Sequence, residues 1–113
     1  MVEQKRNQFG LTVRDMTTIQ SIFESYPEVE TVLIFGSRAK GNYKLGSDVD
    51  LAIMNEGVSI KRMAQLRSDF EESSLPYVID LVHFPKVDHQ EFIDHISRVG
   101  APFYKKSEKA EIT

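Results

Sequence analysis

The stretch GSRAKGNYKLGSDVD occupies residues 36–50 and lies between two apolar runs. Before it, VETVLIF at residues 29–35 is β-branched and aromatic and too short for a core helix, which is typical of a buried strand. At its end, DVDLAIM at residues 48–54 has the pattern of a second strand. Residues 36–47 contain three glycines, two serines and three basic residues, so we expect a turn-rich connection rather than regular structure throughout.

Two carboxylates lie at alternate positions of the second predicted strand. Side chains alternate along a strand, so Asp48 and Asp50 should point to one face, about 7 Å apart at their backbones. Val49, Leu51 and Ile53 should point to the other face and fix the strand in the core. Paired carboxylates hold hard cations of the magnesium class. The alternative is that the two aspartates form a turn or a helix cap before the strand.

A third carboxylate lies within another apolar run, YVIDLVHF at residues 77–84, which predicts a third strand. A charged residue such as Asp80 is costly there unless it is paired or bound to metal. If this strand pairs with the second one, three carboxylates meet, and their repulsion is relieved chiefly by cations. The alternative is a buried arginine or lysine that pairs with Asp80.

The connection after the first strand has the features of a phosphate-binding turn. Gly36 and Ser37 offer exposed backbone N–H groups and a hydroxyl, and Arg38 and Ser47 are further candidate phosphate ligands. For Arg38 and for Lys40, a solvated loop charge is the alternative. Neither GxxxxGK[ST] nor GxGxxG is present, which excludes a P-loop and a dinucleotide fingerprint. A short phosphate-binding turn that leads into a DxD strand indicates a group-transfer reaction on a triphosphate that is bound as its metal complex.

Helices are predicted on both sides of this core. Thr12 and Asp15 have capping-box spacing at the start of a helix over residues 13–25. Ser59 is the expected N-cap of a second helix with apolar positions between residues 60 and 70. Asp88 and Glu91 have capping-box spacing before a final helix that ends near Gly100.

Composition limits the class of protein. The 113 residues fit one domain, residues 1–113, with about 1–10 and 105–113 expected to be flexible. A net charge of -3 gives no basic field, so strong nucleic-acid binding is not expected. No residue is a cysteine, and no apolar run approaches a membrane span, so we expect a soluble, cytoplasmic protein without membrane association.

Some aromatic and histidine residues have less specific interpretations. Tyr43 lies between the two motifs and is a candidate contact for a nucleotide base. His83, His89 and His95 lack metal-ligand spacing and are expected on the surface or at caps. Phe84, Phe92 and Phe103 are expected in the core.

The motif, with ten residues between Ser37 and Asp48, resembles the GS-x10-DxD signature of the DNA polymerase beta-like nucleotidyltransferase superfamily. A DxD alone is expected by chance about 0.4 times in a chain with seven aspartates, whereas its conjunction with Gly-Ser at this spacing is specific. The chain is similar to the smallest members, the minimal nucleotidyltransferases, over nearly its whole length. The resemblance implies an α+β, two-layer fold, a mixed β-sheet of about three to four strands with helices packed on it.

The resemblance also implies a chemistry. In that family the residues matching Asp48, Asp50 and Asp80 bind two Mg²⁺ ions, for which Mn²⁺ can substitute, and the one matching Asp80 helps to activate the attacking hydroxyl. The residues matching Gly36 and Ser37 contact the β and γ phosphates. ATP is the expected substrate, and a hydroxyl is expected to attack its α-phosphorus with release of pyrophosphate.

Larger relatives carry a second domain for the acceptor, and this chain shows none. One hypothesis is an antitoxin-type enzyme that adenylylates a tyrosine of a helical HEPN toxin partner. A second is the catalytic subunit of a two-subunit enzyme that acts on a small molecule or an RNA end. A third is a non-catalytic antitoxin that binds its partner, and a homo-oligomer is a further possibility.

Overall fold

The computed structural model describes residues 5–106. The elements follow in chain order: α1 (Val13–Glu24), β1 (Thr31–Phe35), α2 (Gly36–Lys40), β2 (Val49–Ile53), α3 (Ile60–Glu71), β3 (Ile79–His83), the 3-10 turn η1 (Phe84–Lys86), α4 (Gln90–Val99) and β4 (Ala101–Lys105).

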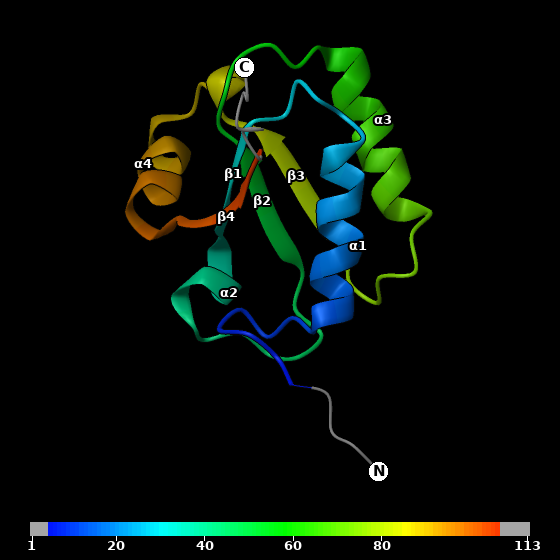
Figure 1. Ribbon diagram of the computed structural model, residues 1–113. Helices are drawn as coiled ribbons and strands as arrows, with labels where there is room; N and C mark the ends of the chain where they lie inside the picture. The colour runs from blue at the N-terminus through cyan, green and yellow to red at the C-terminus, as the bar shows by residue number, and fades with distance from the viewer. Residues whose placement is uncertain (1–4, 107–113) are drawn as a thin grey trace, which may run out of the picture.

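The four strands form one mixed sheet in the order β3-β2-β1-β4 (Figure 1). Strand β1 is antiparallel to β2 and to β4, whereas β2 and β3 are parallel. The parallel pairing is possible because α3 carries the chain back to the start of β3. The expected α+β fold with a mixed sheet is therefore confirmed.

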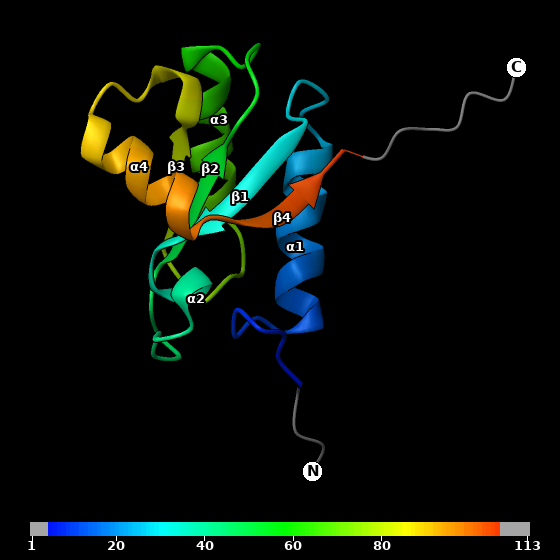
Figure 2. The ribbon, with the colours of Figure 1, turned by 90° about the vertical axis from the view of Figure 1, so that its left-hand side faces the viewer.

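Helices cover the sheet on both faces (Figure 1), so the fold has three layers rather than the two that were expected. Figures 1 and 2 show α1 and α3 on one face and α4 on the other. Alternate residues of β1 and β2 point into the larger cluster with α1 and α3, and the intervening residues point into a smaller cluster under α4. The larger cluster includes Ile19, Phe23, Val32, Ile34, Val49, Leu51, Ile53, Met63, Leu66 and Phe70. The smaller includes Phe35, Ala52 and Ile96, with Leu33, Val82, Phe84 and Phe92 against them.

The first helix begins where the sequence predicts. The Thr12 hydroxyl accepts a hydrogen bond from the Asp15 N–H, and the Asp15 carboxylate accepts one from the Thr12 N–H, each at 3.0 Å. This reciprocal pair satisfies two backbone donors that helical geometry leaves free. Ser59 caps α3 with a single bond, in which its hydroxyl accepts from the Arg62 N–H at 3.1 Å. No helix within residues 5–106 is long and apolar enough to cross a bilayer.

One expectation at the start of an element is wrong, and the connection after β1 has more detail than was expected. The predicted capping box of the last helix is not formed, because α4 begins at Gln90 and its N-cap, His89, makes no side-chain capping hydrogen bond. The predicted connection after β1 contains α2, a helix of five residues that ends at Gly41.

The two ends of the described chain are more structured than expected. Phe9 is buried and packs against Phe103, with 6.1 Å between the ring centroids. Lys105 belongs to β4, a strand that the sequence pattern did not single out. Residues 5–10 and 105–106, which were expected to be flexible, therefore contribute to the fold, and residues 1–4 and 107–113 lie outside the described part.

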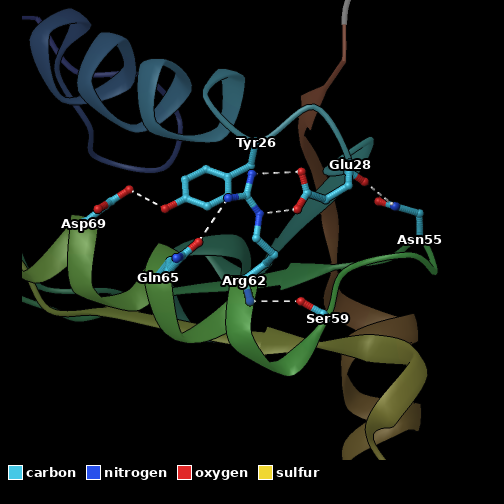
Figure 3. Close-up of polar contacts among 7 residues, drawn as sticks. All are labelled: Tyr26, Glu28, Asn55, Ser59, Arg62, Gln65 and Asp69. Atoms are coloured by element: carbon cyan, nitrogen blue, oxygen red, sulfur yellow. Dashed lines mark hydrogen bonds and ion pairs between the residues drawn. The ribbon is translucent and has the colours of Figure 1, made fainter.

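A polar cluster ties α3 to the connection between α1 and β1 (Figure 3). The Tyr26 hydroxyl donates to Asp69 at 2.6 Å, and Arg62 forms an ion pair with Glu28. The Arg62 guanidinium also lies 4.3 Å from the centroid of the Tyr26 ring. This cluster lies at the end of the sheet where β1 begins and β2 ends.

Candidate functional site

The opposite end of the sheet, beside α2 (Figure 1), carries the residues that the sequence singled out. Strand register places Phe35 opposite Asp50, and Asp50 opposite Asp80, so the three form one row across β1, β2 and β3. Asp50 and Asp80 point to the α4 face, because Val49 and Leu81 on either side of them belong to the larger core cluster. The strand pairing on which the placement of Asp80 depended is confirmed.

Gly36 follows Phe35 directly and contacts this row. Its φ of 75° lies in the left-handed region, which favours glycine. A Cβ atom at this position would overlap Oδ2 of Asp50, so a larger residue could not lie here without displacing that carboxylate. The glycine of the Gly-Ser motif therefore allows the backbone of α2 to approach the carboxylates closely.

Asp50 is half-buried and lies among negative charges. Burial raises the pKa of its carboxyl group to about 6, with further contributions from the charges of Asp80 and Asp48 and from a hydrogen bond with Asp80. Asp48 is exposed and lies immediately before β2. Asp48 lies outside the row formed by Phe35, Asp50 and Asp80, and its charge acts on Asp50 from there. The three predicted carboxylates therefore influence one another, with Asp50 at the centre.

The donor set fits a divalent cation. Asp50 and Asp80 are neighbours, and Asp48 acts on Asp50 through its charge. The repulsion among them contributes to the raised pKa of Asp50, and a bound hard cation relieves repulsion of this kind. Within residues 5–106, no three carboxylate or histidine side chains lie close enough together to hold one metal ion. Repulsion opposes close approach of three carboxylates unless a cation lies between them.

Arg38 has a different environment from the one expected. Its side chain is only 1% exposed, so it is neither a solvated loop charge nor a surface group that faces a phosphate. Its guanidinium donates to the backbone carbonyls of Phe9, Leu45 and Ser47 at 2.8 to 3.1 Å. The expectation of a phosphate contact fails because the connection folds back over Arg38 and its carbonyls occupy the guanidinium donors.

The other candidates in the connection have mixed surroundings. Ser37 is half-buried in α2, one residue from Gly36. The Ser47 hydroxyl accepts a hydrogen bond from the Lys44 N–H at 2.9 Å and so closes a turn before Asp48. Lys40 is exposed. The centroid of the Tyr43 ring lies 5.2 Å from the Arg38 guanidinium carbon, so the ring packs against this side chain. Tyr43 therefore has a structural role that is independent of any contact with a nucleotide base.

Two features of this region were missed at the sequence level. Tyr77 lies under the Arg38 guanidinium at 4.6 Å, and its hydroxyl bonds to both Asp15 and Arg6. A tyrosine at the start of a strand carries no signal for such a contact. His83 was expected on the surface or at a cap. It is the N-cap residue of η1, but its side chain is buried and makes no capping hydrogen bond, and its Nε2 lies 2.9 Å from the Asn55 carbonyl oxygen. That pair joins β3 to the end of β2, away from the carboxylates.

Comparison with known sequences gives two findings. The sequence model of the family described as Polymerase beta, nucleotidyltransferase matches residues 17–109. The chain is 30% identical, over 105 residues, to the probable protein adenylyltransferase MntA of Haemophilus influenzae. That alignment covers 92% of this chain and 91% of the relative.

Comparison with solved structures agrees on the fold. A crystal structure of a toxin–antitoxin with AMP-PNP superposes with a TM-score of 0.66 at 18% identity, over 81% of this chain and 74% of that chain. A proposed nucleotidyltransferase from Sulfolobus solfataricus superposes with a TM-score of 0.52 at 22% identity, over 80% of this chain and 77% of that chain. At these identities the likeness concerns the fold alone.

Proposed function

This chain belongs to the polymerase beta nucleotidyltransferase family and is a nucleotidyltransferase, and from that premise we propose that it transfers AMP from ATP to a protein hydroxyl. The proposed acceptor is a tyrosine of a helical HEPN-type toxin, which this chain would neutralise as an antitoxin. The observation that carries the donor half of the proposal is the row of Asp50 and Asp80 beside Gly36.

The reaction is an in-line substitution at the α-phosphorus of ATP. The acceptor oxygen forms a bond to that phosphorus, the bond from phosphorus to the oxygen bridging the β-phosphate breaks, and pyrophosphate leaves. The acceptor hydroxyl loses its proton to a carboxylate, a role that we assign to Asp80. Asp80 suits this role because it is exposed on β3, at the outer edge of the sheet.

The remaining residues of the site hold the nucleotide. Gly36 permits close approach of backbone to the triphosphate, and the half-buried Ser37 offers its N–H and hydroxyl to phosphate oxygens. Asp48, Asp50 and Asp80 would hold Mg²⁺, two ions by the resemblance, with Mn²⁺ as a substitute. Bound Mg²⁺ supplies a Lewis acid that stabilises negative charge on phosphate oxygens.

Two comparisons support a protein acceptor. The Haemophilus influenzae relative is described as a protein adenylyltransferase, and it aligns with nearly the whole of this chain. One structural neighbour is a toxin–antitoxin determined with AMP-PNP, an adenine nucleotide.

The proposal is tested by incubating the purified protein with Mg²⁺, a HEPN-type protein as candidate acceptor, and ATP labelled at the α- or the γ-phosphate. Label from α-labelled ATP should reach the partner, and label from γ-labelled ATP should not. Mass spectrometry should locate AMP on a tyrosine. The double variant Asp48→Ala with Asp50→Ala should abolish transfer, whereas Asp88→Ala, an exposed aspartate before α4, should not.

Other outcomes would contradict parts of the proposal. Turnover of ATP to pyrophosphate with an RNA end or a small molecule, and an unmodified partner, would favour a two-subunit enzyme. Full neutralisation of the toxin in cells by the double variant would favour a non-catalytic antitoxin. Absence of transfer from any nucleoside triphosphate would contradict the enzymatic proposal.

A further inference from the structure

We propose that Arg38 is a positioning residue, which fixes the entrances to β2 and β3 and thereby places Asp48 and Asp80 around Asp50. The inference rests on the proposed function, because it concerns the same carboxylates. It differs from the sequence expectation, in which Arg38 itself contacts phosphate. Its basis is the set of contacts that the buried guanidinium makes.

The first contact is with the connection that leads into β2. Arg38 Nη2 donates to the carbonyls of Leu45 and Ser47, both at 2.9 Å, and Nε donates to Ser47 at 3.1 Å. Ser47 directly precedes Asp48, so the bonds to its carbonyl fix the peptide from which the aspartate extends. The connection is further closed by the Ser47 N–H, which donates to the Lys44 carbonyl at 2.9 Å.

The second contact is with the entrance to β3. The guanidinium carbon lies 5.2 Å from the centroid of the Tyr43 ring and 4.6 Å from that of the Tyr77 ring. Tyr77 is itself held, because its hydroxyl donates to Asp15 at 2.9 Å and accepts from Arg6 at 3.0 Å. The next residue, Val78, accepts a hydrogen bond from the Val49 N–H at 2.9 Å. Arg38 therefore holds both strand entrances at once.

The third contact is with the N-terminal segment, because Arg38 Nη1 donates to the Phe9 carbonyl at 2.8 Å. Gly10 leaves room for this arrangement, since a Cβ there would lie 2.9 Å from Nη1 and 2.5 Å from the Tyr43 ring. Three segments distant in sequence therefore converge on one side chain. Carbonyl dipoles and aromatic faces satisfy its charge at this depth.

The charge of Arg38 and the geometry of its hydrogen-bond donors can be tested separately. Within residues 5–106 the ion pair that the structure records joins Arg62 and Glu28, so Arg38 is held without a carboxylate in direct contact. A lysine would keep the positive charge but would lose the planar set of donors that reaches three carbonyls. Arg38→Lys therefore separates geometry from charge.

The test compares Arg38→Lys with Arg62→Lys, a matched control. Arg62 also lies on a tyrosine ring and has defined polar partners, but it lies at the other end of the sheet (Figure 3). In Arg38→Lys, we expect faster hydrogen exchange in residues 44–49 and weaker Mn²⁺ binding without nucleotide, by about 10- to 100-fold, measured by electron paramagnetic resonance. Arg62→Lys should change neither, and both variants should keep the wild-type circular dichroism spectrum.

The kinetic readout distinguishes positioning from phosphate contact. Displaced carboxylates should lower kcat more than they raise KM for ATP. A phosphate contact would instead raise KM for ATP and leave Mn²⁺ binding unchanged, and that result would overturn the inference. Faster exchange in residues 44–49 with unchanged Mn²⁺ affinity would also overturn it, since Arg38 would then have a structural role alone.

The proposed function can fail separately. If the wild-type protein binds Mn²⁺ and Arg38→Lys binds it equally well, the inference fails and the metal site stands. If the wild-type protein binds no Mn²⁺, the metal site itself is wrong, and the positioning role falls with it. If Mn²⁺ binds and weakens as expected but no transfer to protein occurs, the acceptor is wrong and the inference is supported.

Discussion

At the scale of single residues, the site depends on how closely charges and backbone approach one another. Asp50 has Asp80 opposite it on β3 and Gly36 close by, and a larger residue than Gly36 would displace its carboxylate. Burial of Asp50 among like charges costs free energy in the folded protein. Removing the charge or filling the space should therefore have opposite effects on stability.

Asp50→Asn should stabilise the metal-free protein at neutral pH. The folded-state pKa of about 6 lies above the ordinary value of 3.8, so protonated Asp50 contributes stability below pH 3.8, and this contribution is lost as pH rises through about 6. The variant should gain about 1–2 kcal/mol at pH 7.5, allowing for solvent screening, and little at pH 4. Urea unfolding in EDTA at the two pH values measures this, and Asp88→Asn should show no such pH dependence.

Gly36→Ala should destabilise the protein and disrupt the site together. A left-handed φ costs a non-glycine residue about 1–3 kcal/mol, and the new Cβ would also displace Asp50. Gly57→Ala is the matched control, because its φ of 94° carries the same backbone cost while its Cβ would meet open space. Thermal melts and Mn²⁺ titrations should show similar destabilisation in both, with weaker Mn²⁺ binding in Gly36→Ala alone. Equal Mn²⁺ binding in the two variants would contradict the close approach.

At the scale of elements, one end of the sheet carries the carboxylates and the other end carries the polar contacts that attach α3. At one end, α2 brings its first residues to the carboxylates of β2 and β3. At the other, the cluster of Tyr26, Glu28, Arg62 and Asp69 fixes α3 to the connection before β1 (Figure 3). Helix α3 returns the chain to the start of β3, which allows β3 to run parallel to β2.

Tyr26→Phe should loosen α3 without affecting the site. Burial and the hydrogen bond with Asp69 raise the pKa of Tyr26 to about 12, so the hydroxyl remains a donor across the physiological range. Loss of a bond to a charged acceptor should cost about 1.5–3 kcal/mol in urea unfolding. Ser25→Ala, which removes an exposed hydroxyl bonded within α1, should cost far less. Similar losses in the two variants would show that the Tyr26–Asp69 bond contributes little.

At the scale of the whole molecule, the chain provides a donor site on a small, weakly acidic domain. The carboxylates are at one end of the sheet, on the face that α4 covers, and Asp80 is on the edge strand. The net charge of -3 supplies no field to attract a polyanion. An acceptor therefore needs specific contacts with the protein surface.

The charge leads to a prediction about nucleic acid. A labelled 30-nucleotide RNA or DNA should show no saturable change in fluorescence anisotropy up to about 100 µM protein at physiological salt, because non-specific binders with basic surfaces reach Kd values of about 10⁻⁴–10⁻⁶ M. A basic RNA-binding domain of similar size serves as the positive control. Saturable binding at lower concentration would favour an RNA acceptor over a protein.

The sequence alone was sufficient for features that local chemistry controls. Capping by Thr12 with Asp15, and by Ser59, follows from side chains within one helical turn, and the alternation of Val49, Leu51 and Ile53 follows from strand geometry. The spacing of Gly36-Ser37 and the two aspartates also identified the family before any coordinates. Each of these signals lies within about fifteen residues. The helix and strand geometry on which the capping and alternation signals depend is the same in every protein.

The tertiary structure decided what depends on distant segments. Strand β4 was missed because its partner, β1, lies some seventy residues earlier in the sequence, and APFYK has no alternation of its own. The environment of Arg38 could not be inferred, because the same basic residue after Gly-Ser can face a phosphate or a folded-back connection. Its partners Phe9, Leu45 and Tyr77 come from three separate segments. Long-range convergence of this kind has no local signature, because its energy arises only when the segments meet.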